Sequence, residues 1–219
     1  MAARRILLIG ATGLVGSRVA GDLLEKGFRV DALVRRSTGR HSPGWHEHVA
    51  DPAEWPSIAS RLDGEVAISA LGTTLRKAGS RRAFRAVDRD AVVDFAGAAR
   101  AAGCRRMILV SSVGADAGAR NFYLRVKGET EAALRALDFD RLDLIRPGLL
   151  RGERDEHRPG ERLGLMISPV AGLLLRGSLA RFAAIDASDV AAAIVALADA
   201  EAVGTFIHHN PDLYRLVRA

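Results

Sequence analysis

The feature that most constrains this chain is the glycine-rich turn GATGLVG at residues 10–16, which follows an apolar run at residues 6–9 and precedes a helical pattern. Glycine is needed at so tight a turn because the backbone adopts angles closed to other residues, and because a pyrophosphate must approach without meeting a Cβ atom. The helix that follows would point its amide groups and its dipole at the phosphates. The turn therefore predicts a strand, a dinucleotide-binding turn and a helix. The alternative is a loop whose glycines only allow close packing.

The rest of the chain alternates short apolar runs with helical patterns. Further strands are expected at residues 28–34, 46–50, 65–71, 106–110, 142–145 and 204–208, and long helices at residues 81–102, 121–137 and 188–200. Such alternation is typical of an α/β fold, in which helices cover both faces of a doubly wound parallel sheet. A chain of 219 residues is an ordinary length for one such domain.

The segment between the last two strands has a different character. Residues 151–162 are highly charged and contain a Pro-Gly pair, so we expect an exposed excursion. The apolar stretch at residues 163–175 is too short to span a bilayer. We therefore expect a helical cover over a pocket, or plain core, and no membrane partner.

Composition limits the classes of function. The net charge is +6, with 29 arginines and 3 lysines, but the arginines are scattered along the chain with few aromatic residues beside them. This pattern is a weak footprint for nucleic acid, and we expect no specific nucleic-acid partner. The six histidines do not stand at metal-ligand spacings, so no metal site is expected.

The single cysteine and the first residues of the chain each carry one expectation. Cys104 is the only cysteine, which excludes an intrachain disulfide, and we expect it to be a buried, inert thiol. The first residues pass directly into the first strand, without the apolar region and cleavage site of a secretory signal. We therefore expect a cytoplasmic protein.

The end of the second strand bears on the choice of dinucleotide. In a dinucleotide-binding sheet this position holds an acid where the ribose 2′-hydroxyl is bound, or an arginine where a 2′-phosphate is bound. Here it holds Arg35 and Arg36, and Asp31 lies farther back inside the strand. A guanidinium suits a phosphate dianion, so the pair predicts NADP(H). The alternative is that both arginines are ordinary solvated charges.

Other strand ends also lie where open α/β sheets bind ligands. Asp51 follows the third strand, where it could accept a hydrogen bond from the adenine amino group or could equally serve only as a helix cap. The fourth strand ends in Leu71, Gly72 and Thr73, and the fifth in two serines. Glycine again marks the carboxyl end of a strand.

The sequence offers one chemical constellation. Tyr123 and Lys127 stand four residues apart on a predicted helix, so they share one face and lie one turn from each other. A phenol, with an ordinary pKa near 10, needs a nearby positive charge to exchange protons near neutrality, and Lys127 is placed to supply that charge. Ser112, at the end of the fifth strand, could hydrogen-bond the substrate oxygen. The alternative is an exposed tyrosine and lysine on a helix surface.

Several stretches together carry a resemblance to a known family: glycines 10, 13 and 16, Arg35 and Arg36, residues 71–74, residues 111–112, Tyr123 with Lys127, and residues 146–148. The combination resembles an atypical short-chain dehydrogenase/reductase of the Tat-interactive oxidoreductase-like group, and the resemblance covers nearly the whole chain. It implies a single NAD(P)-binding Rossmann-type domain over residues 1–219, in which residues 148–185 form a reduced substrate lobe.

The resemblance also implies roles for individual residues. Tyr123 would be the general acid/base, Lys127 would stabilise its ionised form and hold the nicotinamide ribose, and Ser112 would bind the substrate oxygen. The implied cofactor contacts, besides Arg35, Arg36 and Asp51, are Gly10, Thr12, Gly13, Leu14, Val15, Leu71, Gly72, Thr73, Tyr123, Lys127 and Pro147. Extended members of the family commonly have asparagine in the helix after the fourth strand, where this chain has Asp88. Whether Asp88 replaces that asparagine in a proton relay is left open.

The sequence thus predicts an NADPH-dependent oxidoreductase that transfers hydride to or from a small, apolar carbonyl or alcohol. The second hypothesis is an NADPH-binding redox sensor or scaffold that contacts a protein partner with little or no turnover. An enzyme needs room beside the nicotinamide, whereas a sensor needs only the dinucleotide cleft.

Overall fold

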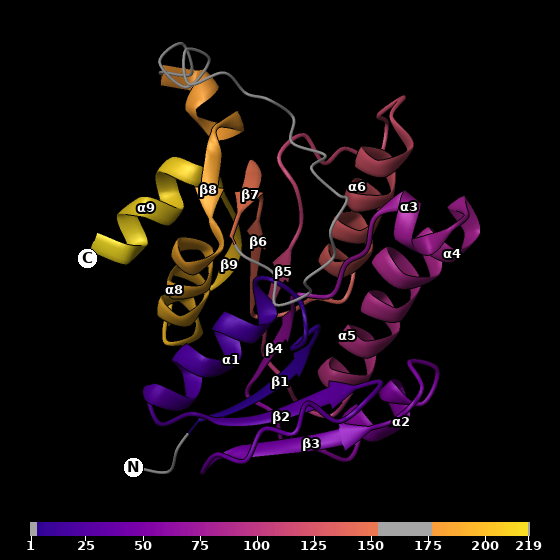
Figure 1. Ribbon diagram of the computed structural model, residues 1–219, viewed down its shortest axis with the longest axis vertical. Coiled ribbons are helices and arrows are strands. Elements are labelled where there is room, and N and C mark those ends of the chain that lie inside the picture. Colours follow the sequence, from indigo (N-terminus) through magenta and orange to yellow (C-terminus); the bar gives the residue numbers. More distant parts are fainter. Residues whose placement is uncertain (1–3, 153–176, 219) are drawn as a thin grey trace.

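The computed structural model describes residues 4–152 and 177–218, and these contain a seven-stranded, fully parallel sheet (Figure 1). The strand order is β3-β2-β1-β4-β5-β6-β9, so the chain builds outward from β1 in one direction and then from β4 in the other. The strands are β1 (Arg5–Ile9), β2 (Arg29–Val34), β3 (Trp45–Val49), β4 (Val66–Ser69), β5 (Arg106–Val110), β6 (Arg141–Ile145) and β9 (Gly204–His208). This topology confirms the predicted Rossmann-type fold class.

Helices cover both faces of the sheet. One face packs against α1 (Gly16–Glu25) and α8 (Ala187–Ala198), and α9 (Asn210–Arg218) lies on α8. The other face packs against α2 (Trp55–Ala59), α5 (Ala91–Ala101) and α6 (Phe122–Arg135). Because both faces are covered, the central strands read as continuous apolar runs, and residues 6–9 are fully buried.

The helix expected at residues 81–102 is divided into three parts. It begins as α4 (Arg81–Arg85), where the Ser80 hydroxyl accepts from the Ala83 amide at 3.1 Å, and it ends as α5. Between them, η1 (Ala86–Asp90) is a π-helical turn, in which the Ala91 amide donates to the Ala86 carbonyl five residues back. The wider turn carries one extra residue. Such turns often occur at functional sites, and this one contains the buried Asp88.

The predicted substrate lobe is described only at its two ends. Its described elements are β7 (Leu149–Arg151) and β8 (Ala184–Asp186), which pair in parallel as a small second sheet, and the 3-10 helix η2 (Gly177–Phe182). A Cβ atom at Gly148 would lie 2.1 Å from the Ala183 carbonyl oxygen, so glycine is required where the lobe leaves the main sheet. The helical cover expected at residues 163–175 lies outside the described residues.

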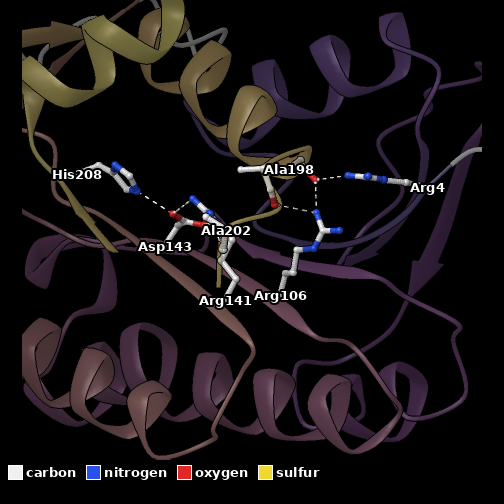
Figure 2. A network of polar contacts seen from close by, with 8 residues as sticks. Arg4, Arg106, Arg141, Asp143, Ala198, Ala202 and His208 are labelled. Carbon is white, nitrogen blue, oxygen red and sulfur yellow. Dashed lines mark hydrogen bonds and ion pairs between the residues drawn. The ribbon is translucent and has the colours of Figure 1, made fainter. Parts of the chain in front are cut away.

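Arginines bind helix and loop carbonyls at the amino ends of the strands (Figure 2). Arg106 of β5 donates to the carbonyls of Ala198 and Ala200 at 3.2 and 3.1 Å, and Arg4 donates to Ala198 at 3.4 Å. These carbonyls belong to the last turn of α8 and the residues after it, which have no partners within the helix. The arginines therefore fix the carboxyl end of α8 against the sheet.

A second arginine network lies beside the first. Arg141 of β6 donates to both carboxylate oxygens of Asp143 at 2.6 and 3.0 Å and to the Ala202 carbonyl at 2.6 Å. His208 of β9 lies 2.7 Å from the same carboxylate. Asp143 is buried, so these partners compensate its charge. Part of the arginine excess is therefore structural.

The remaining composition-based expectations concern Cys104 and the helices. Cys104 is buried, as predicted, and burial raises the pKa of its thiol to about 12, with a smaller contribution from Glu65. Such a thiol is inert at neutral pH. Among the described residues, no helix is both long enough and apolar enough to cross a bilayer.

Candidate functional site

The glycine-rich turn joins β1 to α1. Two of its glycines allow close packing, and a third lines a cavity. Gly10 has a φ of +84°, and a Cβ atom there would lie 2.4 Å from the Ala70 carbonyl carbon. A Cβ atom at Gly16 would lie 2.1 Å from the Gly10 carbonyl oxygen. These two glycines therefore allow the turn to pack against β4 and itself. Gly13 faces a cavity.

This cavity has a volume of about 720 Å³ and lies over the carboxyl ends of β1, β4 and β5. Its described lining consists of Thr12, Gly13, Leu14, Val15, Ser17, Arg18, Arg40, Ala70, Leu71, Gly72, Thr73, Thr74, Lys77, Asp88, Val110, Ser111, Lys127 and Leu150. The charged members of this lining are four cations and one acid, so the cavity favours an anionic ligand. Eight of the predicted cofactor contacts are included: Thr12, Gly13, Leu14, Val15, Leu71, Gly72, Thr73 and Lys127.

A buried ion pair lies in the cavity wall beneath Gly72. The Lys127 ammonium on α6 is 2.7 Å from Asp88 Oδ1, and both side chains are almost fully buried. The Thr73 amide donates to Asp88 Oδ2 at 2.8 Å, and the Thr130 hydroxyl donates to the Asp88 carbonyl at 3.0 Å. Asp88 therefore joins the π-helical turn, the loop after β4 and α6. In this structure it is the counter-ion of Lys127.

Two predicted catalytic residues lie outside the described cavity lining. Tyr123 is half-buried on the first turn of α6, which Asn121 caps by accepting from the Leu124 amide at 3.2 Å. Its ring packs on the buried Phe84, with 5.7 Å between the ring centroids. The Ser112 hydroxyl donates to the Val113 carbonyl at 3.3 Å. Of the three predicted catalytic residues, the structure thus brings only Lys127 into the described lining of the cavity. Tyr123 lies one turn before it on α6, and Ser112 lies in the loop after β5.

Ser111, rather than Ser112, lines the cavity. Its hydroxyl donates to Glu131 Oε1 at 2.6 Å, and Arg146 donates to both oxygens of Glu131 at 2.9 and 2.5 Å. Glu131 is fully buried one helical turn after Lys127. This group, which the sequence analysis missed, locks β5, β6 and α6 together behind the cavity. The four-residue spacing from Lys127 to Glu131 was the available signal.

The assignment of a 2′-phosphate to the two arginines after β2 stays a prediction. Arg35 and Arg36 are exposed, and neither belongs to the described lining of the cavity. Arg40, four to five residues farther along the same loop, does belong to it. Asp31 is buried, and Arg29 and His48 contact its carboxylate at 3.2 and 2.9 Å.

Three further predicted contacts also lie outside that lining. Asp51 Oδ1 accepts from the Ala53 amide at 3.0 Å, which forms an Asx turn shortly before α2 rather than a cap of that helix. The Pro147 carbonyl accepts from the Val113 amide at 3.0 Å and joins the loops after β5 and β6. Gly10 lets the glycine-rich turn pack against Ala70 and does not line the cavity in the described residues.

A comparison with known protein families indicates the class of cofactor. Residues 10–201 match the model of a family described as NAD(P)H-binding. The chain belongs to the NAD(P)H-binding family. The match spans the glycine-rich turn, the Asp88–Lys127 pair and α8, so it includes every residue named above as lining the cavity.

Individual proteins give the same result and confirm the resemblance to atypical short-chain dehydrogenases/reductases. The chain is 34% identical to Protein FMP52, mitochondrial, of Coccidioides immitis over 96% of this chain and 90% of that protein. It is 37% identical to Protein HTATIP2 of Rattus norvegicus over 73% of this chain and 68% of that protein. The Bordetella bronchiseptica enzyme WbmH, solved in complex with NAD+, has the same fold, with a TM-score of 0.71 and 16% identity over 95% of this chain and 76% of that one.

These relatives overturn the cytoplasmic expectation. Several fungal relatives, including those of Emericella nidulans and Coccidioides immitis, are named as mitochondrial proteins. The inference failed because it tested only for the apolar leader of a secreted protein. Mitochondrial import depends on a different, amphipathic and arginine-rich signal.

Proposed function

We propose that this protein is an NADPH-dependent oxidoreductase that transfers hydride to or from a small, apolar carbonyl or alcohol. The observation that carries the proposal is the Lys127–Asp88 pair at 2.7 Å, buried in the wall of a cavity beside the glycine-rich turn. Catalytic and ligand-binding side chains in open α/β sheets gather at this edge. The apolar lining residues Val110 and Leu150 suit an apolar substrate.

The described residues fit a dinucleotide. A volume of about 720 Å³ is in the range of ligand pockets, Gly13 leaves the backbone open to a phosphate, and α1 begins directly after the turn. Lys127 would hold the ribose next to the nicotinamide, and the cations of the lining would face the phosphates. When bound, the dinucleotide supplies the hydride.

The chain itself would supply the proton. In this proposal the Tyr123 hydroxyl protonates the substrate oxygen, or takes the proton in the reverse direction, and Lys127 stabilises the negative charge left on the phenol. Asp88 is a positioning residue, because it holds the Lys127 ammonium in the cavity wall. The ring of Tyr123 is oriented by packing on Phe84.

The test compares turnover with binding in three proteins: the unmodified chain, Tyr123→Phe and Lys127→Met. Tyr123→Phe removes one oxygen and keeps the ring on Phe84, so NADPH affinity should stay within about threefold, while the rate should fall by about 10² to 10⁴. Lys127→Met should lower both the rate and the affinity. The measurements are NADPH oxidation with a panel of apolar aldehydes, ketones and quinones, and calorimetric titration with NADPH.

The turnover of Tyr123→Phe shows whether Tyr123 is the general acid. A loss of less than about threefold in every turnover for Tyr123→Phe would exclude Tyr123 as the acid. Phe122→Leu, next to Tyr123 on the same turn, is the matched control and should retain both turnover and binding.

A second function is favoured by the same geometry. The charge of Lys127 is already compensated by Asp88, and Tyr123 lies outside the described cavity lining. Both features suit a protein that binds NADPH and signals the redox state to a protein partner with little or no turnover. Tight NADPH binding without turnover of any carbonyl in the panel would favour this sensor over the enzyme.

A further inference from the structure

We propose that Asn210 is a positioning residue for the substrate. It holds strand β7, which carries Leu150, and through Leu150 it sets the affinity of the cavity for an apolar ligand. Asn210 itself does not belong to the described lining of the cavity. This inference rests on the proposed function, because it names the residue that places the apolar part of the same cavity wall.

The contacts of the Asn210 side chain are the first argument. Its Oδ1 atom accepts from the Gly148 amide at 3.0 Å, and its Nδ2 atom donates to the Ala183 carbonyl at 2.8 Å. These partners fix the orientation of the side-chain amide, because a backbone N–H only donates and a backbone carbonyl only accepts. Asn210 is 1% exposed, so both bonds are shielded from water.

The place of these two partners in the chain is the second argument. The parallel pairing of β7 with β8 begins at Leu149 and Ala184. Gly148 and Ala183 directly precede these two residues. The side-chain amide of Asn210 therefore bridges the two strands at the point where their pairing starts.

The packing around Gly148 shows how closely the three segments meet. A Cβ atom at Gly148 would lie 2.1 Å from the Ala183 carbonyl oxygen and 3.1 Å from Asn210 Nδ2. The start of β7, the start of β8 and the first turn of α9 thus leave no room for a side chain. In such close packing, a change in the Asn210 amide is transmitted to the start of β7.

The residues before β7 are fixed independently of Asn210. The Arg146 amide donates to the His208 carbonyl at 2.8 Å, and the Pro147 carbonyl accepts from the Val113 amide at 3.0 Å. Asn210 supplies the next tether along the chain, at residue 148. A change at Asn210 should therefore loosen β7 and leave the end of β6 in place.

Strand β7 connects this tether to the cavity. Leu150, in the middle of β7, lines the cavity and also packs against the core cluster that contains its β8 partner, the fully buried Ile185. The strand ends beside the glycine-rich turn, since a Cβ atom at Gly152 would lie 3.1 Å from Leu14 Cδ1. The position of β7 therefore decides how far Leu150 reaches into the cavity.

The experiment measures the dissociation constants of small apolar ketones for the full chain saturated with NADP⁺, a complex that has no hydride to give. Asn210→Asp keeps the acceptor but places a carboxylate against the Ala183 carbonyl, so ketone affinity should fall by about 3- to 10-fold. Leu150→Ala removes the wall itself and should lower the affinity by about 10-fold. Asp212→Asn makes a matched acid–amide change on the same turn of α9 and should alter the affinity by less than about twofold.

Two further measurements identify the route. If Asn210 acts through Leu150, the double variant Asn210→Asp/Leu150→Ala should bind the ketone within about twofold of Leu150→Ala, because the effects of coupled residues do not add. Amide hydrogen exchange at residues 149–151 should be at least about tenfold faster in Asn210→Asp and unchanged at residues 106–110 of β5. Where a ketone is reduced, KM should rise with the dissociation constant and kcat should stay within about threefold.

The possible results separate this inference from the proposed function. Ketones that bind but are not reduced with NADPH would refute the enzyme, while weaker binding by Asn210→Asp would still support the role of Asn210. Faster exchange with unchanged ketone affinity would make Asn210 purely structural and overturn the inference. Additive losses in the double variant would also overturn it, because Asn210 would then act elsewhere. If the unmodified protein binds no ketone, the apolar substrate class and this inference both fail.

A second variant covers the case in which Asn210→Asp does not fold. Asn210→Ser removes the bridge without adding a charge, and it carries the same expectations for ketone affinity and amide exchange. Ketone affinity that stays at the level of the unmodified chain in a folded Asn210→Ser variant would overturn the inference equally.

Discussion

At the scale of single residues, Asp88 compensates the charge of Lys127 in the cavity wall. Its carboxylate is in contact with the Lys127 ammonium and accepts from the Thr73 amide, in a place where a Cβ atom at Gly72 would lie only 3.5 Å from Asp88 Oδ1. A buried charge that loses its only counter-ion is strongly destabilising, because the remaining ion stays desolvated. The pair is therefore expected to contribute to folding as well as to binding.

The corresponding prediction concerns Asp88→Asn. Asparagine retains an acceptor for the Thr73 amide but leaves Lys127 uncompensated, so we expect a loss of about 2–4 kcal/mol in the free energy of unfolding. NADPH should restore part of this loss by mass action. Urea unfolding with and without NADPH measures both effects. Asp90→Asn, in the same π-helical turn but paired with Arg89 at the surface, is the control and should cost under about 1 kcal/mol. Equal losses for the two variants would show that the buried pair adds no stability.

At the scale of an element, the loop between β2 and β3 is held by one acid. Burial raises the pKa of Glu47, but the hydrogen bonds from Thr38, Ser37 and Trp45 together outweigh it, so that the pKa lies below its ordinary value of 4.5. A carboxyl group with a lowered pKa in the folded state contributes stability above pH 4.5, and this contribution is lost as the pH falls through the folded value. Because Glu47 is only partly buried, the contribution should be less than about 1 kcal/mol.

The prediction is an acid-induced change confined to this loop. As the pH falls through the lowered pKa of Glu47, the hydrogen bond from the Trp45 indole should lose its charged acceptor and weaken, and the tryptophan fluorescence should change before the sheet unfolds. Glu47→Gln, which has no titrating group, should lack this step. The comparison of fluorescence and far-ultraviolet circular dichroism between pH 6 and 3 checks it. A step that persists in Glu47→Gln would assign the change to another group.

At the scale of the whole molecule, the cavity and the arginine contacts that fix α8 are located at opposite ends of the sheet. The cavity lies over the carboxyl ends of the strands, whereas Arg4 and Arg106 bind the end of α8 at the amino ends (Figure 2). Positive charge at a helix carboxyl end is favourable because of the helix dipole. A change at this end should therefore alter folding and leave the cavity unaffected.

Arg106→Met tests this separation. It removes the donor to Ala198 and Ala200 and keeps an unbranched side chain against the sheet, so we expect a loss of about 1–3 kcal/mol in the free energy of unfolding. NADPH affinity should remain within about twofold of the original. Arg105→Met, at the neighbouring exposed position, should change neither quantity appreciably. Chemical unfolding and calorimetric titration of the three proteins provide the measurements. A marked loss of NADPH affinity in Arg106→Met would contradict the separation.

The fold class and the glycine-rich turn between β1 and α1 could be predicted from the sequence. The runs at residues 6–9 and 106–110 are recognisable because parallel strands covered on both faces must be apolar throughout, and Gly10 is recognisable because only glycine tolerates the backbone angles there. Both signals are local, so neighbouring residues are sufficient to read them. Lys127 was identified in the same way, through its helical spacing from Tyr123.

The tertiary structure decided which charged side chains reach the cavity. Arg35 and Arg40 belong to one loop and have the same chemistry, and only the contacts of that loop with Glu47, Trp45 and α1 direct Arg40 inward. Likewise, Asp88 meets Lys127 because a π-helical turn adds one residue to a helix that sequence periodicity treats as regular. The direction of a side chain depends on residues distant in the chain, and no local pattern contains that information.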